Sequence, residues 1–262
     1  MKQVIQTADE VFDVTLEGPA DAPVVMLSNS LGTRHAMWDA QAAALRERFR
    51  VLRYDPRGFS AQSQASGDFS IAQMGDDAVA LMDALGIAQV HWCGISMGGA
   101  VGLWLLVNRP ERIASAVIAN SAPYFGGPAN WAQIESVRAT GLAGVAEGSS
   151  QRVLTPAFRA ARPDVVESIR ALIASAPVGA WAGCAAALRD MDLRGTLGGI
   201  RHPMLLIGGT DDLTTPWTAT LALHEALPHA QICQLQAAHL SNIEQADAFN
   251  AALLDFLPSR RA

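Results

Sequence analysis

The chain has 262 residues, half of them hydrophobic and 17% charged, and its formal net charge at pH 7 is −6. This length suits a single domain of α/β architecture, and the apolar fraction allows a large core and argues against disorder. The negative net charge argues against nucleic acid and anionic membrane surfaces as partners.

The three cysteines, Cys93, Cys184 and Cys233, are widely spaced and form no Cys-x-x-Cys pair or Cys/His cluster. This pattern indicates neither a zinc site nor a disulfide framework, and it is typical of buried thiols in a reducing compartment. The first six residues lack the apolar segment of a signal peptide, and no stretch approaches a membrane span. We therefore expect a soluble, cytoplasmic protein.

The first half of the chain alternates β-type runs with helical segments. Strands are expected over residues 24–28, 51–55, 90–93 and 113–119, and helices over 36–49, 71–85 and 98–108. Ser70 and Gln73 have the spacing of a capping box at the start of the second helix, which Gly86 ends. Strands that alternate with helices predict an α/β fold, in which helices flank both faces of a mostly parallel sheet.

Residues 123–195 break this alternation, because strand-like runs give way to short helical pieces such as 131–140 and 164–173. Strand character returns at 204–207 and 231–235, and a final amphipathic helix is expected over about 243–257. The pattern predicts an α/β core formed by residues 1–122 and 196–262, with a helical insertion at 123–195.

Ser96 lies in Gly94-Ile95-Ser96-Met97-Gly98, between a predicted strand and a predicted helix. A serine hydroxyl needs a base that removes its proton, and it must be held where a substrate can reach it. Glycines at both ends of the motif let the strand and the helix approach closely while the serine takes a strained backbone conformation. We predict that Ser96 is a catalytic nucleophile.

The acid that orients the base is expected after a later strand. The loop at 208–216 follows the strand ending at Ile207 and contains both Asp211 and Asp212. Asp212 is preferred because its spacing from Gly209 and from Pro216 matches the usual acid loop. Asp211 is interpreted as a solvent-facing turn residue.

His239 is the candidate base, because it is the one histidine beyond the last predicted strand. It follows Asp212 by 27 residues, where a loop can reach over the edge of the sheet. The other histidines are His35, His91, His202, His224 and His229. Four of them have structural interpretations, whereas a catalytic role for His35 is left open because it lies beside the loop described next.

Acyl transfer also needs donors for the oxyanion that develops on the carbonyl. The backbone N–H of Met97, directly after the serine, is one predicted donor. The second predicted donor is the N–H of Leu31, in the loop after the strand at 24–28.

Several segments, taken together, resemble the 3-oxoadipate enol-lactonases, which have the α/β-hydrolase fold. They cover residues 28–33, 37–39, 93–99, 155–159, 189–194 and 238–244. The motif around Ser96 is common to all α/β-hydrolases, whereas Asn-Ser-Leu-Gly at 29–32 and His-Leu-Ser-Asn-Ile-Glu at 239–244 are more specific to the lactonases. The resemblance covers nearly the whole chain, and it makes the insertion at 123–195 the family's helical cap.

The resemblance implies hydrolysis of a small enol-lactone that carries a carboxylate, without cofactor or metal, in the β-ketoadipate pathway of bacterial aromatic catabolism. Ser96 would attack the lactone carbonyl, His239 would take its proton, and Asp212 would hold the imidazole tautomer. The opened enol would stay bound as an acyl-enzyme until water releases the dicarboxylate.

Two segments depart from the family pattern. The turn at 55–63 has Phe59-Ser60 where the family has His-Gly, which affects the geometry of that loop. Residues 152–155, Arg-Val-Leu-Thr, stand where relatives often have an aromatic pair, and this change is expected to reshape the pocket.

A carboxylated substrate needs a cationic partner, for which Arg34, Arg138 and Arg189 are the candidates. Trp38 and Trp131 are candidates for the pocket walls. From these we predict that Trp38, Trp131 and Arg138 contact the substrate.

The same three catalytic residues serve many reactions, so the fold leaves the substrate open. The alternatives are a carboxylesterase, a C–C bond hydrolase, a perhydrolase or cofactor-free haloperoxidase, and a receptor that binds a ligand without catalysis. Surfaces of the cap and of the sheet edge could support a homo-oligomer.

Overall fold

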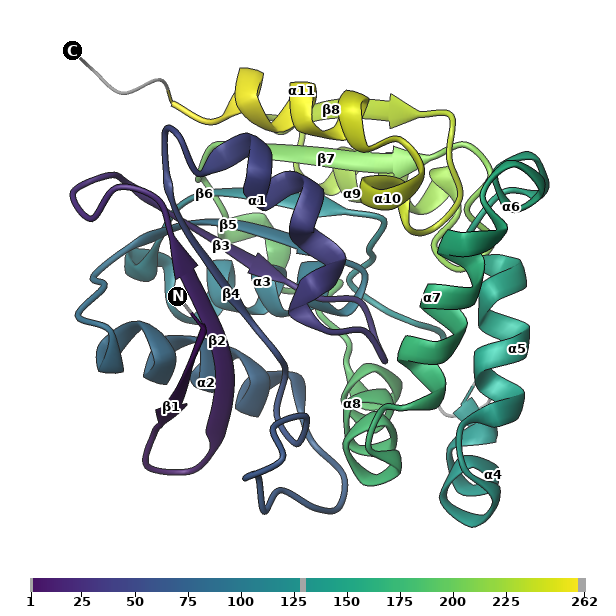
Figure 1. Cartoon of the computed structure of the whole chain (residues 1–262). Coiled ribbons are helices and arrows are strands. Elements are labelled where there is room, and N and C mark those ends of the chain that lie inside the picture. The colour runs from purple at the N-terminus through teal and green to yellow at the C-terminus, as the bar shows by residue number, and fades with distance from the viewer. Residues whose placement is uncertain (1, 128–130, 259–262) are drawn as a thin grey trace.

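The computed structural model describes residues 2–127 and 131–258, and its centre is an eight-stranded sheet with helices on both faces (Figure 1). The strand order is β1-β2-β4-β3-β5-β6-β7-β8. The strands are β1 (Lys2–Gln6), β2 (Val11–Glu17), β3 (Val24–Ser28), β4 (Arg50–Tyr54), β5 (Val90–Ile95), β6 (Ile113–Ala119), β7 (Met204–Gly209) and β8 (Gln231–Leu235). The predicted α/β class with a mostly parallel sheet is confirmed, since only the β1–β2 and β2–β4 pairs are antiparallel in the described chain.

The helices of the core cover the two faces of the sheet. They are α1 (Asp39–Leu45), α2 (Ile71–Ala84), α3 (Met97–Asn108), α9 (Trp217–Ala226), α10 (Ser241–Glu244) and α11 (Ala246–Phe256). Side chains of α1 and α11 belong to one buried hydrophobic cluster, and those of α2 and α3 belong to the other. Successive residues of β5 alternate between them, because Trp92 belongs to the α2–α3 cluster and Cys93 to the α1–α11 cluster.

The capping box of α2 forms as predicted: the Ser70 hydroxyl accepts the N–H of Gln73, and the Gln73 side chain accepts the N–H of Ser70. The expected final helix is divided instead, because Gln245 has non-helical angles (φ −123°, ψ 50°) between α10 and α11.

Five α-helices lie in the described part of the insertion between β6 and β7, and Figure 1 shows them together beside one end of the sheet. They are α4 (Gln133–Thr140), α5 (Ala143–Arg152), α6 (Pro156–Ala161), α7 (Pro163–Ala174) and α8 (Val178–Asp190). The helical pieces expected at 131–140 and 164–173 correspond to α4 and α7. The division of the chain at residues 123 and 195 stays a prediction.

The register of the strands brings the loops after β3, β5, β6 and β7 to one edge of the sheet. Ser28 pairs with Gly94, and Ala119 pairs with both Ile95 and Ile207, so β3, β5, β6 and β7 end side by side. Residues directly after these strands therefore meet at the carboxyl edge of the sheet, where parallel α/β sheets bind ligands.

In the described part of the chain, no single helix has the length and apolar composition to cross a membrane. Only α7 and α8 taken together have them, and this pair is bent by 94°.

Candidate active site

Ser96 occupies a sharp turn between β5 and α3. Its backbone angles, φ 56° and ψ −114°, belong to a region that a residue with a side chain rarely adopts. Such a conformation costs about 1–3 kcal/mol and persists only where neighbours enforce it. Here the Ser96 N–H donates to the Ala119 carbonyl at 2.9 Å, and the Ser121 hydroxyl donates to the Ser96 carbonyl at 2.7 Å.

The turn requires glycine at both ends of the motif, because the neighbouring backbone leaves no room for a Cβ. A Cβ on Gly94 would overlap the carbonyl of Gly98, and one on Gly98 would overlap the carbonyl of Ser28. The Gly98 N–H also donates to the Asn29 carbonyl at 2.9 Å. The start of α3 is thus held against the end of β3, which fixes Ser96 beside the loop that follows β3.

Asp212 and His239 form a buried pair. Nδ1 of His239 lies 2.8 Å from Oδ2 of Asp212, and the two residues are 2% and 3% exposed, respectively. The Thr215 hydroxyl and the Asn120 amide also donate to Oδ2, at 2.8 and 3.0 Å, while the N–H groups of Thr214 and Thr215 donate to Oδ1. Burial alone would raise the pKa of Asp212, but His239 and these hydrogen bonds hold it below its ordinary value.

Asp211 is exposed, and its carboxylate accepts a hydrogen bond from Thr210 rather than from His239. His35 is paired with Asp55, with 2.8 Å between Nδ1 and Oδ1. Of the six histidines, only His239 is among the described residues that line the cavity holding Ser96.

Leu31 and Met97 are the residues predicted to donate to the oxyanion. Leu31 lines the cavity, and Met97 is the first residue of α3, directly after Ser96. In the described part of the chain, the Leu31 N–H makes no backbone hydrogen bond, and the Met97 N–H, at the first position of α3, has no acceptor within the helix. Both groups are therefore free to donate to a bound oxygen.

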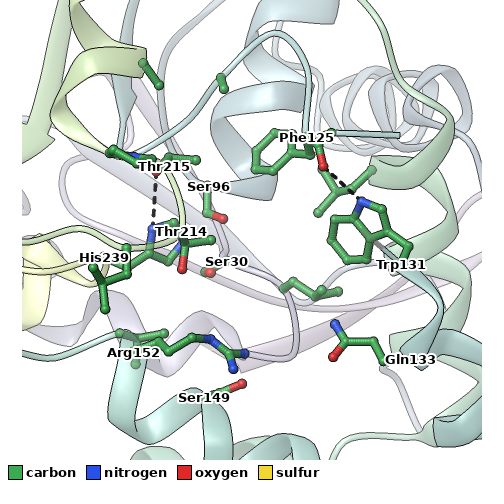
Figure 2. A pocket seen from close by; sticks show the side chains of 18 of the residues that line it. Ser30, Ser96, Phe125, Trp131, Gln133, Ser149, Arg152, Thr214, Thr215 and His239 are labelled. Atoms are coloured by element: carbon green, nitrogen blue, oxygen red, sulfur yellow. Dashed lines mark hydrogen bonds between the residues drawn. The ribbon is translucent and has the colours of Figure 1, made fainter. Parts of the chain in front are cut away.

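The cavity has a volume of about 570 Å³, within the usual range for small-molecule sites. Figure 2 shows Ser96 and His239 on one side of it, with Trp131 and Gln133 on the other. Polar and apolar groups contribute about equally to its wall, and they come from the loops of the core and from α4, α5 and α8 of the insertion. The insertion thus forms part of the cavity that holds the serine.

Of the residues predicted to contact substrate, Trp131 lines the cavity, and its indole N–H donates to the Phe125 carbonyl at 3.1 Å. Trp38 does not, because it is fully buried and its indole donates to Asn29 at 3.0 Å. Its prediction as a pocket wall is corrected on this ground: it packs inside the core.

Arg138 is also outside the cavity lining, because it forms ion pairs with Asp68 and Glu135. Arg34 binds Asp55 at 3.0 Å, and Arg189 binds Asp68 and Asp190. The prediction that Arg138 contacts the substrate is therefore corrected, and neither of the other two candidates lines the cavity in its place.

The cation that does line the cavity is Arg152, the last residue of α5. Sequence reasoning noted it only as part of a segment that departs from the family pattern. Asn120, which holds Asp212, was missed as well, and its position directly after β6 is the signal that could have found it.

The departure at Phe59 leaves the turn ordered. Phe59 is buried, its carbonyl accepts a hydrogen bond from Arg34 at 3.0 Å, and the Arg34 guanidinium lies 5.5 Å from the centre of its ring. Asp55 in the same turn accepts the N–H of His35, so the turn supports the loop after β3.

Within the described residues, no group of three or more His, Cys, Asp or Glu side chains could hold a metal ion. Cys93 and Cys184 are free thiols in the core, and burial raises the pKa of Cys184 to about 12. Such thiols are unsuited to nucleophilic roles.

A buried Asp–His pair whose histidine shares a cavity with a strained serine is the arrangement of serine hydrolases. The alpha/beta hydrolase fold family matches residues 23–246. The 3-oxoadipate enol-lactonase 2 of Acinetobacter baylyi is 37% identical over 96% of this chain and 95% of its own length. A crystal structure of the enol-lactonase from Burkholderia xenovorans superposes with a TM-score of 0.94 at 35% identity, covering 97% of this chain and 99% of that one.

A protein of Agrobacterium fabrum with a proposed carbamate hydrolase activity is 31% identical over 94% of this chain and 97% of its own length. The chain belongs to the alpha/beta hydrolase fold family. Within that family it is a hydrolase that resembles the enol-lactonases.

Proposed function

We propose that the protein opens 3-oxoadipate enol-lactone to 3-oxoadipate through an acyl-enzyme on Ser96, as a step of the β-ketoadipate pathway. The observation that carries the proposal is the Asp212–His239 pair, whose histidine lines one cavity with the strained Ser96. The similarity to enol-lactonases over nearly the full length supports the choice of substrate.

The first half of the reaction forms the acyl-enzyme. Because Asp212 occupies Nδ1 of His239, the other ring nitrogen, Nε2, accepts the Ser96 proton while Oγ attacks the lactone carbonyl. The N–H groups of Leu31 and Met97 donate to the oxyanion. The bond from the carbonyl carbon to the ring oxygen then breaks, and Nε2 returns its proton to the enolate.

The second half releases the product. The enol, still bound to Ser96 through its acyl group, becomes a ketone. A water molecule then gives a proton to His239 and attacks the acyl carbon, and Ser96 leaves with that proton as the carboxylic acid forms.

The test is a comparison of the purified protein on the enol-lactone, an aryl ester and a carbamate. We expect kcat/KM for the lactone to exceed the other two by about tenfold or more, which is about 1.4 kcal/mol of transition-state stabilisation. Asp212→Asn should lower kcat by about 10³–10⁴, whereas the matched variant Asp211→Asn should change it less than about twofold.

A lactone rate no higher than the ester or carbamate rate would replace the proposal with an esterase or a carbamate hydrolase. Halogenation that depends on peroxide and acetate would favour the perhydrolase. A fluorophosphonate probe should label the wild-type protein and fail to label Ser96→Ala. Failure to label the wild type as well would argue for a receptor.

A further inference from the structure

The cavity that holds Ser96 has an uneven charge. Its described lining contains no Asp or Glu side chain, and Arg152 is its one permanently charged residue. A cavity with a cation and no carboxylate favours an anionic ligand over a neutral one, because the charge of the ligand is met by an opposite charge.

Arg152 differs from the other described arginines of the insertion in having neither an ion pair nor a hydrogen bond at its guanidinium; Arg159, which also lacks an acidic partner, donates to the Gln151 carbonyl. Arg138, Arg162, Arg170 and Arg189 each form an ion pair with Asp or Glu. In the described part of the chain, no hydrogen bond or ion pair is made by the Arg152 guanidinium. Glu147, the acidic residue of its own helix, is directed to Arg170 on α7, at 3.5 Å.

Two neutral donors accompany this guanidinium. Figure 2 shows the Arg152 side chain extending into the cavity between Ser96 and Ser149, with Gln133 directed into the same space from α4. Ser149 precedes Arg152 by three residues on α5, so both lie on the same helix face. Over residues 2–127 and 131–258, neither the Gln133 amide nor the Ser149 hydroxyl has a hydrogen-bond partner in another side chain or the backbone.

We propose that Arg152, assisted by Gln133 and Ser149, binds a carboxylate of the substrate and thereby selects lactones and esters that carry one. The inference rests on the proposed function, since an enol-lactone of a dicarboxylic acid retains one free carboxylate when the other forms the ring. A guanidinium binds a carboxylate through two parallel N–H donors, which fixes the orientation of the substrate as well as its charge. The carbonyl to be attacked is then held toward Ser96.

The kinetic experiment compares a carboxylated ester with its neutral methyl ester, alongside the enol-lactone. In Arg152→Gln, kcat/KM for the lactone and the carboxylated ester should fall about tenfold. This is the lower end of the range for a hydrogen bond to a charged group, and it is expected because Arg152 is exposed. The rate on the neutral ester should stay within about twofold. Arg162→Gln, which removes an exposed arginine of the same insertion, is the matched control and should change neither rate.

A binding experiment makes the test independent of turnover. Adipate, a stable dicarboxylate, is titrated calorimetrically into Ser96→Ala protein and into the double variant with Arg152→Gln. We expect a Kd about tenfold weaker in the double variant, with the difference reduced at high salt.

The outcomes separate this inference from the proposed function. Lactone turnover that is unchanged in Arg152→Gln, or equal losses on charged and neutral esters, would overturn the role of Arg152 and leave the lactonase proposal standing. If the wild type fails to open the lactone but still prefers carboxylated esters through Arg152, the proposed function fails and the carboxylate site holds.

Discussion

Asn120, directly after β6, shares with Ser96 a positive φ that is otherwise confined to glycines in the described chain. Its amide donates to Oδ2 of Asp212 at 3.0 Å and to the Ala238 carbonyl at 3.3 Å, and its oxygen accepts the Ser241 hydroxyl at 2.5 Å. One side chain therefore ties the carboxylate to the loop that carries His239. Because it donates to the oxygen that His239 also contacts, it helps to keep Asp212 ionised.

Asn120→Asp tests this role, because the new side chain has the same shape and also tolerates a positive φ. It replaces the donor with a second carboxyl group beside Asp212, and like charges at this distance raise the apparent pKa of the pair. We expect the acid limb of the kcat/KM–pH profile to move upward by about one unit or more, with a plateau kcat about tenfold lower.

Ser241→Ala is the control for this variant, since it removes the contact on the far side of the Asn120 amide without adding a charge. It should lower kcat less and leave the pH profile in place. An unchanged profile in Asn120→Asp would show that Asn120 is only a packing residue.

At the scale of elements, Glu244 of α10 joins the insertion to the loop that carries His239. Its carboxylate, in a residue 9% exposed, accepts the N–H of Ala238 at 3.0 Å, the N–H of Thr155 at 3.2 Å and the Thr155 hydroxyl. Beside it, the Leu240 N–H donates to the Val153 carbonyl at 3.0 Å. These contacts set the end of α5, and with it Arg152, relative to His239.

Glu244→Gln removes the charge that accepts these donors and turns one acceptor into a donor. We expect the free energy of unfolding to fall by about 1–3 kcal/mol and kcat/KM for the lactone to fall with it. Urea denaturation and steady-state kinetics measure the two effects. The exposed Glu225 on α9 supplies the control, because Glu225→Gln should stay within about 0.5 kcal/mol of wild type; an equally small change in Glu244→Gln would refute the link.

The sequence predicted best what is decided locally. The turn at Ser96 depends on a few adjacent residues, and Asp212 and His239 could be placed by the order of strands and loops. The arginine in the cavity could not be predicted in this way. Arg138 and Arg189 are held outside the cavity by the same partner, Asp68, which lies 70 and 121 residues away from them in the chain. Arg152 faces the cavity because of how α5 packs against α7, which composition does not reveal.

Over the described residues, hydrogen bonds and ion pairs attach the insertion to the core at two separated places, in addition to the apolar packing of α8. Asp68, between β4 and α2, binds Arg138 of α4 and Arg189 of α8, and the next residue, Phe69, donates its N–H to the Gly183 carbonyl at 3.1 Å. Glu244 and Leu240 make the other attachment. Exposed ion pairs contribute little stability, so the buried Glu244 contacts should hold the insertion more firmly than the Asp68 pairs.

The stability of the whole molecule should depend on pH through its buried carboxylates. Burial would raise the pKa of Asp55, but the contacts with His35 and Arg34 outweigh burial and hold the pKa below its ordinary value. The pKa of Asp212 is likewise held below its ordinary value. A depressed folded-state pKa gives stability that is present above the unfolded value near 4 and is lost as pH falls through the folded pKa. Asp77 acts oppositely, because burial raises its pKa to about 6, and its protonation between about pH 6 and 4 favours the folded form.

We therefore expect the main acid loss of stability below about pH 4, where Asp77 is already protonated and no longer offsets it. Asp55→Asn should unfold about 1–3 kcal/mol more easily than wild type at pH 7, because the buried contacts with His35 and Arg34 lose their charged acceptor. This difference should shrink as the pH falls toward 3, since the wild-type carboxylate is then being protonated as well. Urea denaturation of both proteins from pH 7 to 3 measures it, and a difference that stays constant over this range would show that the Asp55 charge does not stabilise the fold.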